Sequence, residues 1–196
     1  KGKLFMEIQR TNNLQFGARF ISPAKIKYKA PNGKWEKMDV SFIKFDTYKK
    51  SDVSLVENIS QLWNNKNLSG AIAEEANILG RKSQIYALTS QLKDFEQINP
   101  RQVLGLMTTG KIKKGEDVEI FKIGTNPLFA YEQNHRDRTF KHIAKSMIES
   151  FKNLVGLKSK GSETFVQYAD SPQEIKFLSR VGLEPRDKEI VRFINK

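Results

Sequence analysis

The feature that most constrains this chain is a run of apolar residues at helical spacing between Thr139 and Val155. An apolar stripe of this kind must be buried against other structure. The segments before and after it, EDVEIFKIGT and ETFVQYAD, have the composition of strands. A helix between two strands can serve as the crossover that parallel strands require. The stripe consists of Phe140, Ile143, Ala144, Met147, Ile148, Phe151, Leu154 and Val155.

The remaining segments predict further strands and short helices. SQIYALTS, RQVLGLMTTGK and EDVEIFKIGT follow one another across short turns, including 113–116, and predict an antiparallel meander. Near the N-terminus, LFMEIQR, ARFIS, AKIKYKA and KWEKMDVSFIKFD predict strands, the last two forming a β-hairpin around Pro31–Gly33. Helices are expected behind an N-cap at Ser51-Asp52, over 68–79, and from Pro172 to Val181. KEIVRFI predicts a last strand. The sequence therefore predicts a mixed α/β chain.

Composition and charge narrow the class of protein. The 196 residues, 38% hydrophobic and 29% charged, predict one soluble globular domain. Without cysteines and with two histidines the chain can form no disulfide or thiolate site, and we predict no metal. No apolar run reaches membrane-spanning length and KGKLFMEIQR has no signal-peptide core, so we expect a cytoplasmic protein without membrane contact.

The net charge of +12 is unevenly distributed. Residues 1–50 hold 12 basic and 4 acidic side chains and therefore carry +8 of it. Such a balance favours an anionic partner, which we expect to be a nucleic acid or an acidic protein at the basic N-terminal region. The alternative is a basic surface that only keeps the protein soluble.

Cations also gather at the start of the predicted helix. Arg136, Arg138, Lys141 and Lys145 lie where the free amides and the positive end of the helix dipole already attract anions. Four cations at this end oppose the dipole, which favours a bound phosphate. The alternative is a solvated helix start.

From Val40 to the end, the order of elements and two motifs resemble the GNAT N-acetyltransferase superfamily. In that family a loop with the pattern Q/R-x-x-G-x-G/A opens a helix, and its amides hold the pyrophosphate of acetyl-coenzyme A. FKHIAKSMIESF is similar to this run, with Thr139 at the Q/R position, His142 at the first glycine and Ala144 at the second. Because glycine alone accepts positive φ freely, His142 predicts a less tightly folded loop or an amide reached differently. YADSPQEIKFLSRVGLEP resembles the family's C-terminal signature.

The resemblance implies a mixed, mostly antiparallel sheet with helices on both faces, in a single domain whose residues 1–39 are an N-terminal β-hairpin extension of a core at 40–196. It implies acetyl-coenzyme A as co-substrate, with Glu119 as the base that deprotonates the amine. The alternative for Glu119 is an exposed carboxylate pairing with a lysine across the hairpin. The cofactor-binding residues implied are Ile123, Arg136, Arg138, Thr139, Lys141, His142, Ile143, Ala144, Lys145 and Phe177.

Leu178 occupies the position at which the family often has a tyrosine that protonates the leaving thiolate. Tyr168 on the next-to-last predicted strand can supply that proton, or it is simply a half-buried strand tyrosine. His135 is a further candidate that acts on the acceptor or binds a phosphate, or it is a solvated loop histidine.

Three functions follow from these observations. The first is an acyl-coenzyme A-dependent N-acetyltransferase acting on an amine, for which the basic N-terminal region favours an anionic acceptor such as a charged tRNA or a nucleic-acid-bound protein. The second is a GNAT-like binding module without catalysis. The third is a nucleic-acid-binding protein in which the cationic loop and hairpin contact phosphates directly.

Overall fold

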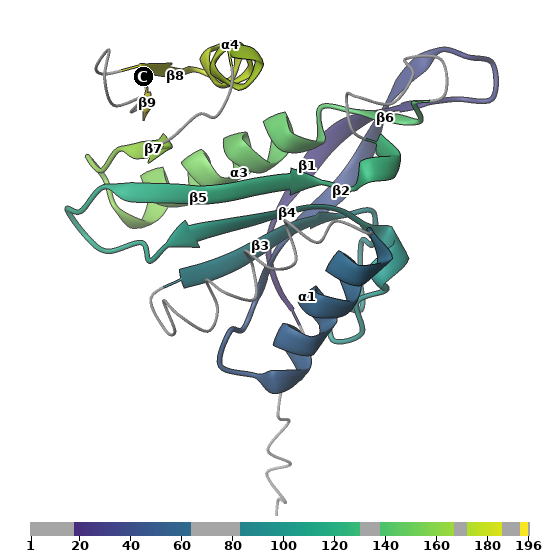
Figure 1. Cartoon of the computed structure of the whole chain (residues 1–196), viewed down its shortest axis with the longest axis horizontal. Helices are drawn as coiled ribbons and strands as arrows, with labels where there is room; N and C mark the ends of the chain where they lie inside the picture. Colours follow the sequence, from purple (N-terminus) through teal and green to yellow (C-terminus); the bar gives the residue numbers. More distant parts are fainter. Residues whose placement is uncertain (1–17, 64–82, 130–137, 167–171, 186–192, 196) are drawn as a thin grey trace, which may run out of the picture.

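A computed structural model describes residues 18–63, 83–129, 138–166, 172–185 and 193–195 (Figure 1). Short 3-10 turns cover Pro100–Gln102 and Pro127–Phe129. The strands are β1 (Arg19–Lys29), β2 (Trp35–Phe45), β3 (Ser83–Thr89), β4 (Val103–Gly110), β5 (Val118–Thr125), β6 (Phe140–Lys141), β7 (Thr164–Val166), β8 (Leu183–Pro185) and β9 (Phe193–Asn195). The helices are α1 (Lys50–Leu62), α3 (Ile143–Lys158) and α4 (Pro172–Arg180).

Seven strands form one sheet in the order β6-β1-β2-β3-β4-β5-β7. Every neighbouring pair is antiparallel except β5 and β7, which are parallel and joined through α3 (Figure 1). The predicted meander of β3, β4 and β5 and the crossover helix are therefore confirmed. Strands β8 and β9 pair separately in a two-stranded sheet.

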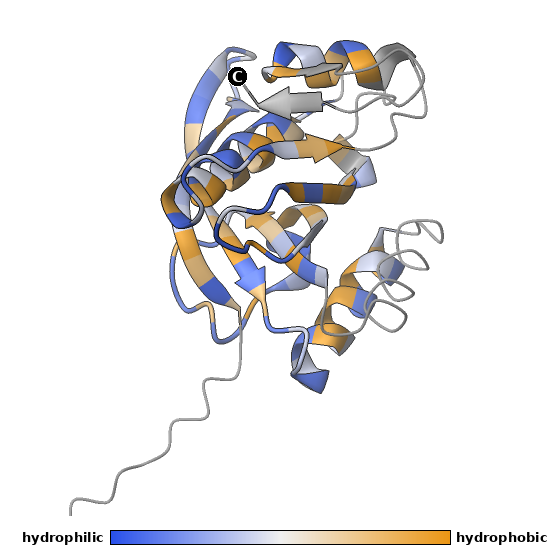
Figure 2. Cartoon of the chain, turned by 90° about the vertical axis from the view of Figure 1, so that its left-hand side faces the viewer, coloured by the Kyte–Doolittle hydropathy of each residue, from blue (hydrophilic) through white to orange (hydrophobic). Residues whose placement is uncertain are grey.

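Helices lie on both faces of the sheet because successive strand residues point to opposite sides. Phe42 and Tyr86 pack with Phe151 of α3 in one core cluster, whereas Ile43 and Ile85 pack with residues of α1 in the other. Figure 2 shows the turns between the strands as largely hydrophilic. The fold class predicted from the sequence, a mixed and mostly antiparallel sheet covered on both faces, is confirmed.

The N-terminal hairpin is part of this sheet. Gly33 has a φ of +79° in the turn, a conformation that glycine adopts without strain, as the Pro31–Gly33 signal predicts. Strand β2 pairs with β1 on one side and with β3 on the other. The boundary expected at residues 39 and 40 lies within β2, and the segment 4–10 lies outside the described residues.

Helix α1 does not begin at the predicted N-cap. Lys49 is its N-cap residue, in extended conformation and without a side-chain hydrogen bond to the helix. Asp52 is buried in the first turn, and its carboxylate accepts the backbone N–H of Asp46 at 2.8 Å. Asp52 therefore fixes the chain entering α1 rather than capping it. The helix expected over 68–79 lies outside the described residues.

Helix α3 begins later than predicted. Residues 139–142 precede it in extended or turn conformation, and Phe140-Lys141 forms β6 opposite Lys27 and Tyr28 of β1. The backbone N–H of Lys29 donates to the Thr139 carbonyl at 2.8 Å. Phe140 joins the apolar stripe from this strand. Helix α4 ends at Arg180, one residue before the predicted end, and Gly182 follows with a φ of +79°.

Within the described ranges, no helix has the length and apolar character needed to cross a membrane. Among those same residues, no group of three or more His, Asp or Glu side chains is arranged to hold a metal ion.

Candidate functional site

The loop that opens α3 has the backbone conformation typical of a glycine at its N-cap position, although the residue there is His142. His142, the N-cap residue, has φ 70° and ψ 20°, in the left-handed region. Its carbonyl accepts the first helical N–H, from Ser146, at 2.9 Å. The expectation of a looser loop is therefore wrong, since His142 takes the left-handed conformation directly after the residue of β6 that pairs with Lys27. The amides of Ile143, Ala144 and Lys145 are the first-turn donors that a helix leaves without intrahelical partners.

Positive charge surrounds this helix start. The pKa of His142 is lowered from its usual range, first by partial desolvation of the ring and then by Lys27, Lys145, Lys141 and Arg138. Lys145 pairs with Glu149 one turn on at 3.6 Å, a half-exposed pair that does little to offset the other cations. Because α3 also directs the positive end of its dipole here, the site is suited to an anion.

Arg138, whose side chain is half-buried, is held in place from the preceding 3-10 turn. Its Nε donates to the carbonyl of Phe129 at 3.2 Å. The ring of Phe129 packs edge-on against Phe140, with centroids 4.7 Å apart. The fold thus holds this guanidinium close to the start of α3.

A row of three lysines crosses the neighbouring strands. Lys27 of β1 lies directly opposite Lys37 of β2 on one side and Lys141 of β6 on the other. Like charges at such positions repel one another. The Nζ of Lys141 lies 3.9 Å from the centre of the Trp35 ring, a cation–π contact that orients it. This three-lysine row carries a dense positive charge beside the start of α3.

Two contacts place the first turn of α3 on the sheet. The hydroxyl of Ser146 donates to the carbonyl of Lys25 in β1 at 2.5 Å. Gly105 of β4 lies under the helix, where an added Cβ would meet Met147 Sδ at 2.6 Å and Ile143 Cγ2 at 3.0 Å. Sequence reasoning did not single out Gly105, although a glycine inside an apolar strand is a known signal for close approach.

The edge of β5 is the second part of the site. Pairing between β5 and β7 covers Val118, Glu119 and Ile120 and extends no further among the described residues. Strand β5 continues to Thr125, and Gly124 lies beside Gly105 near the start of α3. Among the described residues, no strand pairs with β5 beyond Ile120 on this side, and this stretch leads toward the start of α3. An unpaired strand edge offers backbone donors and acceptors to a ligand.

Glu119 lies at the far end of this edge. It is half-buried, opposite Phe165 of β7, and six residues of strand, roughly 20 Å, separate it from Thr125. Val118 and Ile120 pack into the core on the α3 side, so Glu119 points toward the opposite face. The structure therefore separates the predicted base from the predicted phosphate-binding residues by the length of β5.

The other predicted site residues differ in how deeply they are buried. Ile123 and Phe177 are half-buried and pack against the core on the α3 side, and Leu178 is fully buried in that core. Thr139 is exposed, Ala144 is half-buried, and Ile143 contributes its side chain to the core. The predicted residues Arg136, Tyr168 and His135 lie outside the described residues.

No family model matches this sequence, and no curated protein gives a significant match. Among solved structures, the chain is similar to aminoglycoside 6'-acetyltransferase type Ii, with a TM-score of 0.47, 12% identity, and coverage of 78% of this chain and 92% of that one. It is also similar to Arabidopsis thaliana NAA60 in complex with a bisubstrate analogue, with a TM-score of 0.45, 13% identity, and coverage of 79% and 95%. At these identities and TM-scores the likeness assigns no ligand and no activity.

Proposed function

We propose that this protein is an acyl-coenzyme A-dependent N-acetyltransferase. The observation that carries the proposal is the geometry of β5: past Glu119 and Ile120 it has no partner strand on this side among the described residues, and it leads to the cationic start of α3. Acetyl-coenzyme A is an elongated molecule with a pyrophosphate and a thioester separated by its pantetheine arm. A strand edge with an anion site at one end and a carboxylate near the other suits such a molecule.

The cofactor's phosphates would lie at the first turn of α3. The amides of Ile143, Ala144 and Lys145 would donate to them, and Arg138 and Lys141 would supply charge. The pantetheine amides would add to the edge of β5 as a short extra strand would, with Ile123 beside it. The thioester would then lie toward the amino end of β5, where Glu119 is.

In the transfer step, the free amine attacks the thioester carbonyl, so that a C–N bond forms and the C–S bond breaks. Glu119, directly or through a water, takes the proton that the amine must lose. Tyr168 is our candidate for returning a proton to the thiolate, since Leu178 has no proton to give. Holding both substrates in this alignment supplies much of the rate enhancement.

Isothermal titration with acetyl-coenzyme A, followed by an acetyl-release assay on a panel of amines, tests the proposal. We expect binding by the parent, and Glu119→Gln should retain that affinity while lowering kcat by about a hundredfold or more. Tyr168→Phe should lower kcat without changing affinity. The matched control is Glu57→Gln, an exposed carboxylate on α1. No heat and no thermal shift with the cofactor would rule the proposal out, whereas binding without turnover of any amine would favour the binding module.

The three-lysine row supports a second candidate function, contact with a nucleic acid or an acidic protein surface. Lys27, Lys37 and Lys141 lie side by side next to the half-buried ring of Trp35. Backbone phosphates spaced along a strand would neutralise such a row. This contact is compatible with acetyl transfer if the acceptor is itself bound to nucleic acid.

Salt-dependent RNA binding measured with Lys27→Gln and Lys37→Gln tests this second function. We expect the double variant to lower RNA affinity and to flatten the dependence of log Kd on log salt. Its acetyl-coenzyme A affinity should fall less than its RNA affinity, because Lys27 adds charge near His142 whereas Lys37 lies one strand further away. An unchanged salt slope would contradict a role for the row.

A further inference from the structure

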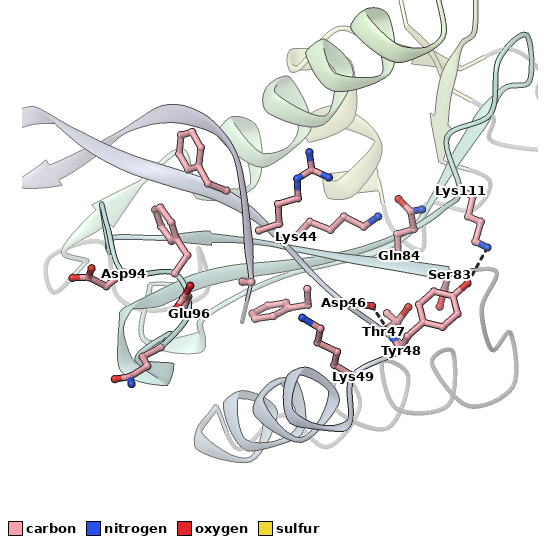
Figure 3. A pocket seen from close by; sticks show the side chains of 16 residues that line it. Lys44, Asp46, Thr47, Tyr48, Lys49, Ser83, Gln84, Asp94, Glu96 and Lys111 are labelled. Atoms are coloured by element: carbon pink, nitrogen blue, oxygen red, sulfur yellow. Dashed lines mark hydrogen bonds between the residues drawn. The ribbon is translucent and has the colours of Figure 1, made fainter. Parts of the chain in front are cut away.

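A cavity of about 1180 Å³ lies away from the candidate acetyl-coenzyme A site. Its walls come from the start of β1, the end of β2 with the turn into α1, the start of β3, residues 94–97 and Lys111 after β4 (Figure 3). The start of α3 packs instead near Lys25 and Gly105. The cavity is therefore a separate site, closer to the C-terminal end of α3, where Lys158 approaches Lys44.

Four cations from separate parts of the chain line this cavity: Arg19 of β1, Lys44 of β2, Lys49 just before α1 and Lys111 after β4. Lys44 of β2 is half-buried, and burial lowers its pKa, followed by the charge of Lys158; Asp46 opposes this, and Arg19 and Lys111 lower it further. Within the described ranges, no carboxylate forms an ion pair with any of these four cations. A half-buried lysine with more cationic than anionic neighbours favours a bound anion.

Aromatic surface lies next to the cations. The Tyr48 side chain is 56% exposed, and its hydroxyl lies 3.4 Å from Lys111 Nζ. That nitrogen is 6.0 Å from the centre of the Tyr48 ring. Phe20 is 43% exposed and stacks on Phe95 with centroids 5.3 Å apart. Exposed rings beside lysines are what proteins use to stack a base while holding its phosphate.

Carboxylates complete the opposite wall. Figure 3 shows Asp94 and Glu96 on the side of the cavity away from Lys111 and Tyr48. Carboxylates accept hydrogen bonds, which suits ribose hydroxyls and the exocyclic amine of a base. They also disfavour a ligand that is anionic along its whole length. A third lining carboxylate, Asp46, accepts the backbone N–H of Tyr48 at 3.0 Å at the cation end, where the four lysine and arginine side chains outnumber it. The cavity thus has a mainly cationic end and a carboxylate-bearing end.

We propose that this cavity binds a nucleotide, with its phosphate between Lys44 and Lys111 and its base against the Tyr48 ring. The ligand is either a free nucleotide or one unit of a single strand, since both present the same phosphate and base. Because the site is distinct from the start of α3, the proposal does not rest on acetyl transfer.

Titrations with AMP, adenosine, inorganic phosphate and a short single-stranded RNA test the proposal. We expect AMP or the RNA to bind, adenosine to bind at least about tenfold more weakly, and phosphate to bind more weakly than AMP. RNA binding without AMP binding identifies a strand as the source, and AMP binding identifies a free nucleotide. Equal affinity for adenosine and AMP would overturn the phosphate assignment, and so would failure of both AMP and RNA to bind.

Substitutions of the lining residues test whether the nucleotide binds in this cavity. Lys44→Gln and Lys111→Gln should each weaken nucleotide binding about tenfold, and Tyr48→Ala should weaken it about fivefold or more without affecting phosphate. Lys176→Gln, on the exposed surface of α4, is the matched control. Lys111→Gln and Tyr48→Ala keep the test valid if the half-buried Lys44 proves necessary for folding.

Acetyl-coenzyme A also carries a nucleotide, so the two sites must be separated. Arg138→Gln should weaken acetyl-coenzyme A binding and leave AMP or RNA binding unchanged, and Lys111→Gln should do the reverse. Nucleotide binding that is lost with Arg138→Gln and kept with Lys111→Gln would overturn the cavity proposal and move the nucleotide to α3.

Discussion

The two ends of α3 are both basic, but among the described residues only the C-terminal end has side-chain hydrogen bonds that complete it. At the C-terminal end, the buried Ser159 hydroxyl donates to the Lys113 carbonyl at 2.7 Å and accepts the Gly115 N–H at 3.0 Å. Lys158 in the last turn matches the negative end of the dipole. At the N-terminal end, His142 makes no side-chain cap hydrogen bond, and Arg138, Lys141 and Lys145 oppose the dipole.

This difference separates a structural terminus from a ligand-binding one. The C-terminal end is completed by the turn between β4 and β5, so its polar groups stabilise the fold. The N-terminal end combines unsatisfied amides, cations that oppose the dipole and a strained residue, each of which costs stability in the absence of an anion. Such costs are common where a ligand binds, and variants at the two ends should therefore behave in opposite ways.

The largest effect is expected at the C-terminal end. Ser159→Ala leaves the Gly115 N–H and the Lys113 carbonyl without their shared partner in a buried position. We expect the free energy of unfolding to fall by about 2–3 kcal/mol, measured by urea denaturation. Acetyl-coenzyme A affinity should be unchanged at temperatures where the variant is folded.

The matched control is Ser179→Ala. Ser179 is exposed near the end of α4, and its hydroxyl donates to the Ile175 carbonyl at 3.0 Å. Its loss should cost less than about 0.5 kcal/mol, because water can replace an exposed hydrogen bond. Equal losses for the two variants would remove the structural role that we give to Ser159.

At the N-terminal end of α3, we expect substitutions to affect cofactor affinity more than stability. Removing both charges in Arg138→Gln/Lys145→Gln should weaken acetyl-coenzyme A binding by about tenfold or more, measured by isothermal titration. Stability in the absence of ligand should fall by less than it does for Ser159→Ala, because removing two cations that oppose the dipole offsets part of the loss of the Arg138–Phe129 hydrogen bond and the Lys145–Glu149 pair.

Lys158→Gln is the comparison at the opposite end. It removes the same charge where the dipole favours it, so stability should fall by about 0.3–1 kcal/mol while cofactor affinity stays constant. If cofactor affinity falls equally for charge removal at either end, the effect is long-range electrostatics and the distinction between the two ends fails.

Sequence reasoning recovered the elements better than their boundaries. The apolar stripe of α3 and the glycines at turns are local signals, and they placed the crossover helix and the turn at Gly33 correctly. The start of α3 depends on β6 pairing with β1, a contact between residues more than a hundred positions apart that no local pattern encodes. For the same reason the sequence could not place Gly105 beneath Met147.

The candidate site shows the same limit. The cations before α3 could be recognised from composition, because a helix start has a known electrostatic preference. The left-handed conformation of His142 could not be recognised, because a histidine does not signal positive φ as a glycine does. The cavity around Lys44 has no sequence signal because its walls come from five parts of the chain and share no motif.

His142→Gly tests whether the N-terminal end stores strain. Glycine adopts a φ of 70° without the penalty that a histidine incurs, although it also makes the unfolded chain more flexible. We expect a net gain of about 0.5–1 kcal/mol in the free energy of unfolding. His142→Ala is the control, since it removes the imidazole but retains a Cβ, and it should give no gain. Equal stabilities for the two variants would show that the backbone there is unstrained.

The smallest effect is the titration of His142 itself. Its pKa is lowered by partial desolvation and by the surrounding cations, so a bound anion that offsets those cations should raise it toward the usual range. NMR of the imidazole with and without acetyl-coenzyme A measures this shift. A pKa that rises on binding means that binding takes up protons, so affinity should increase modestly from neutral to mildly acidic pH.

The pH dependence of folding stability has the opposite sign to that of cofactor affinity. A histidine with a lowered folded-state pKa stabilises the fold fully above its ordinary pKa, and this contribution is lost as the pH falls through the folded value. His142→Gly should therefore reduce both the acid sensitivity of the unliganded protein and the pH dependence of cofactor binding. If the cofactor binds and the imidazole pKa does not move, the phosphates lie away from His142, and the N-terminal end of α3 serves another anion.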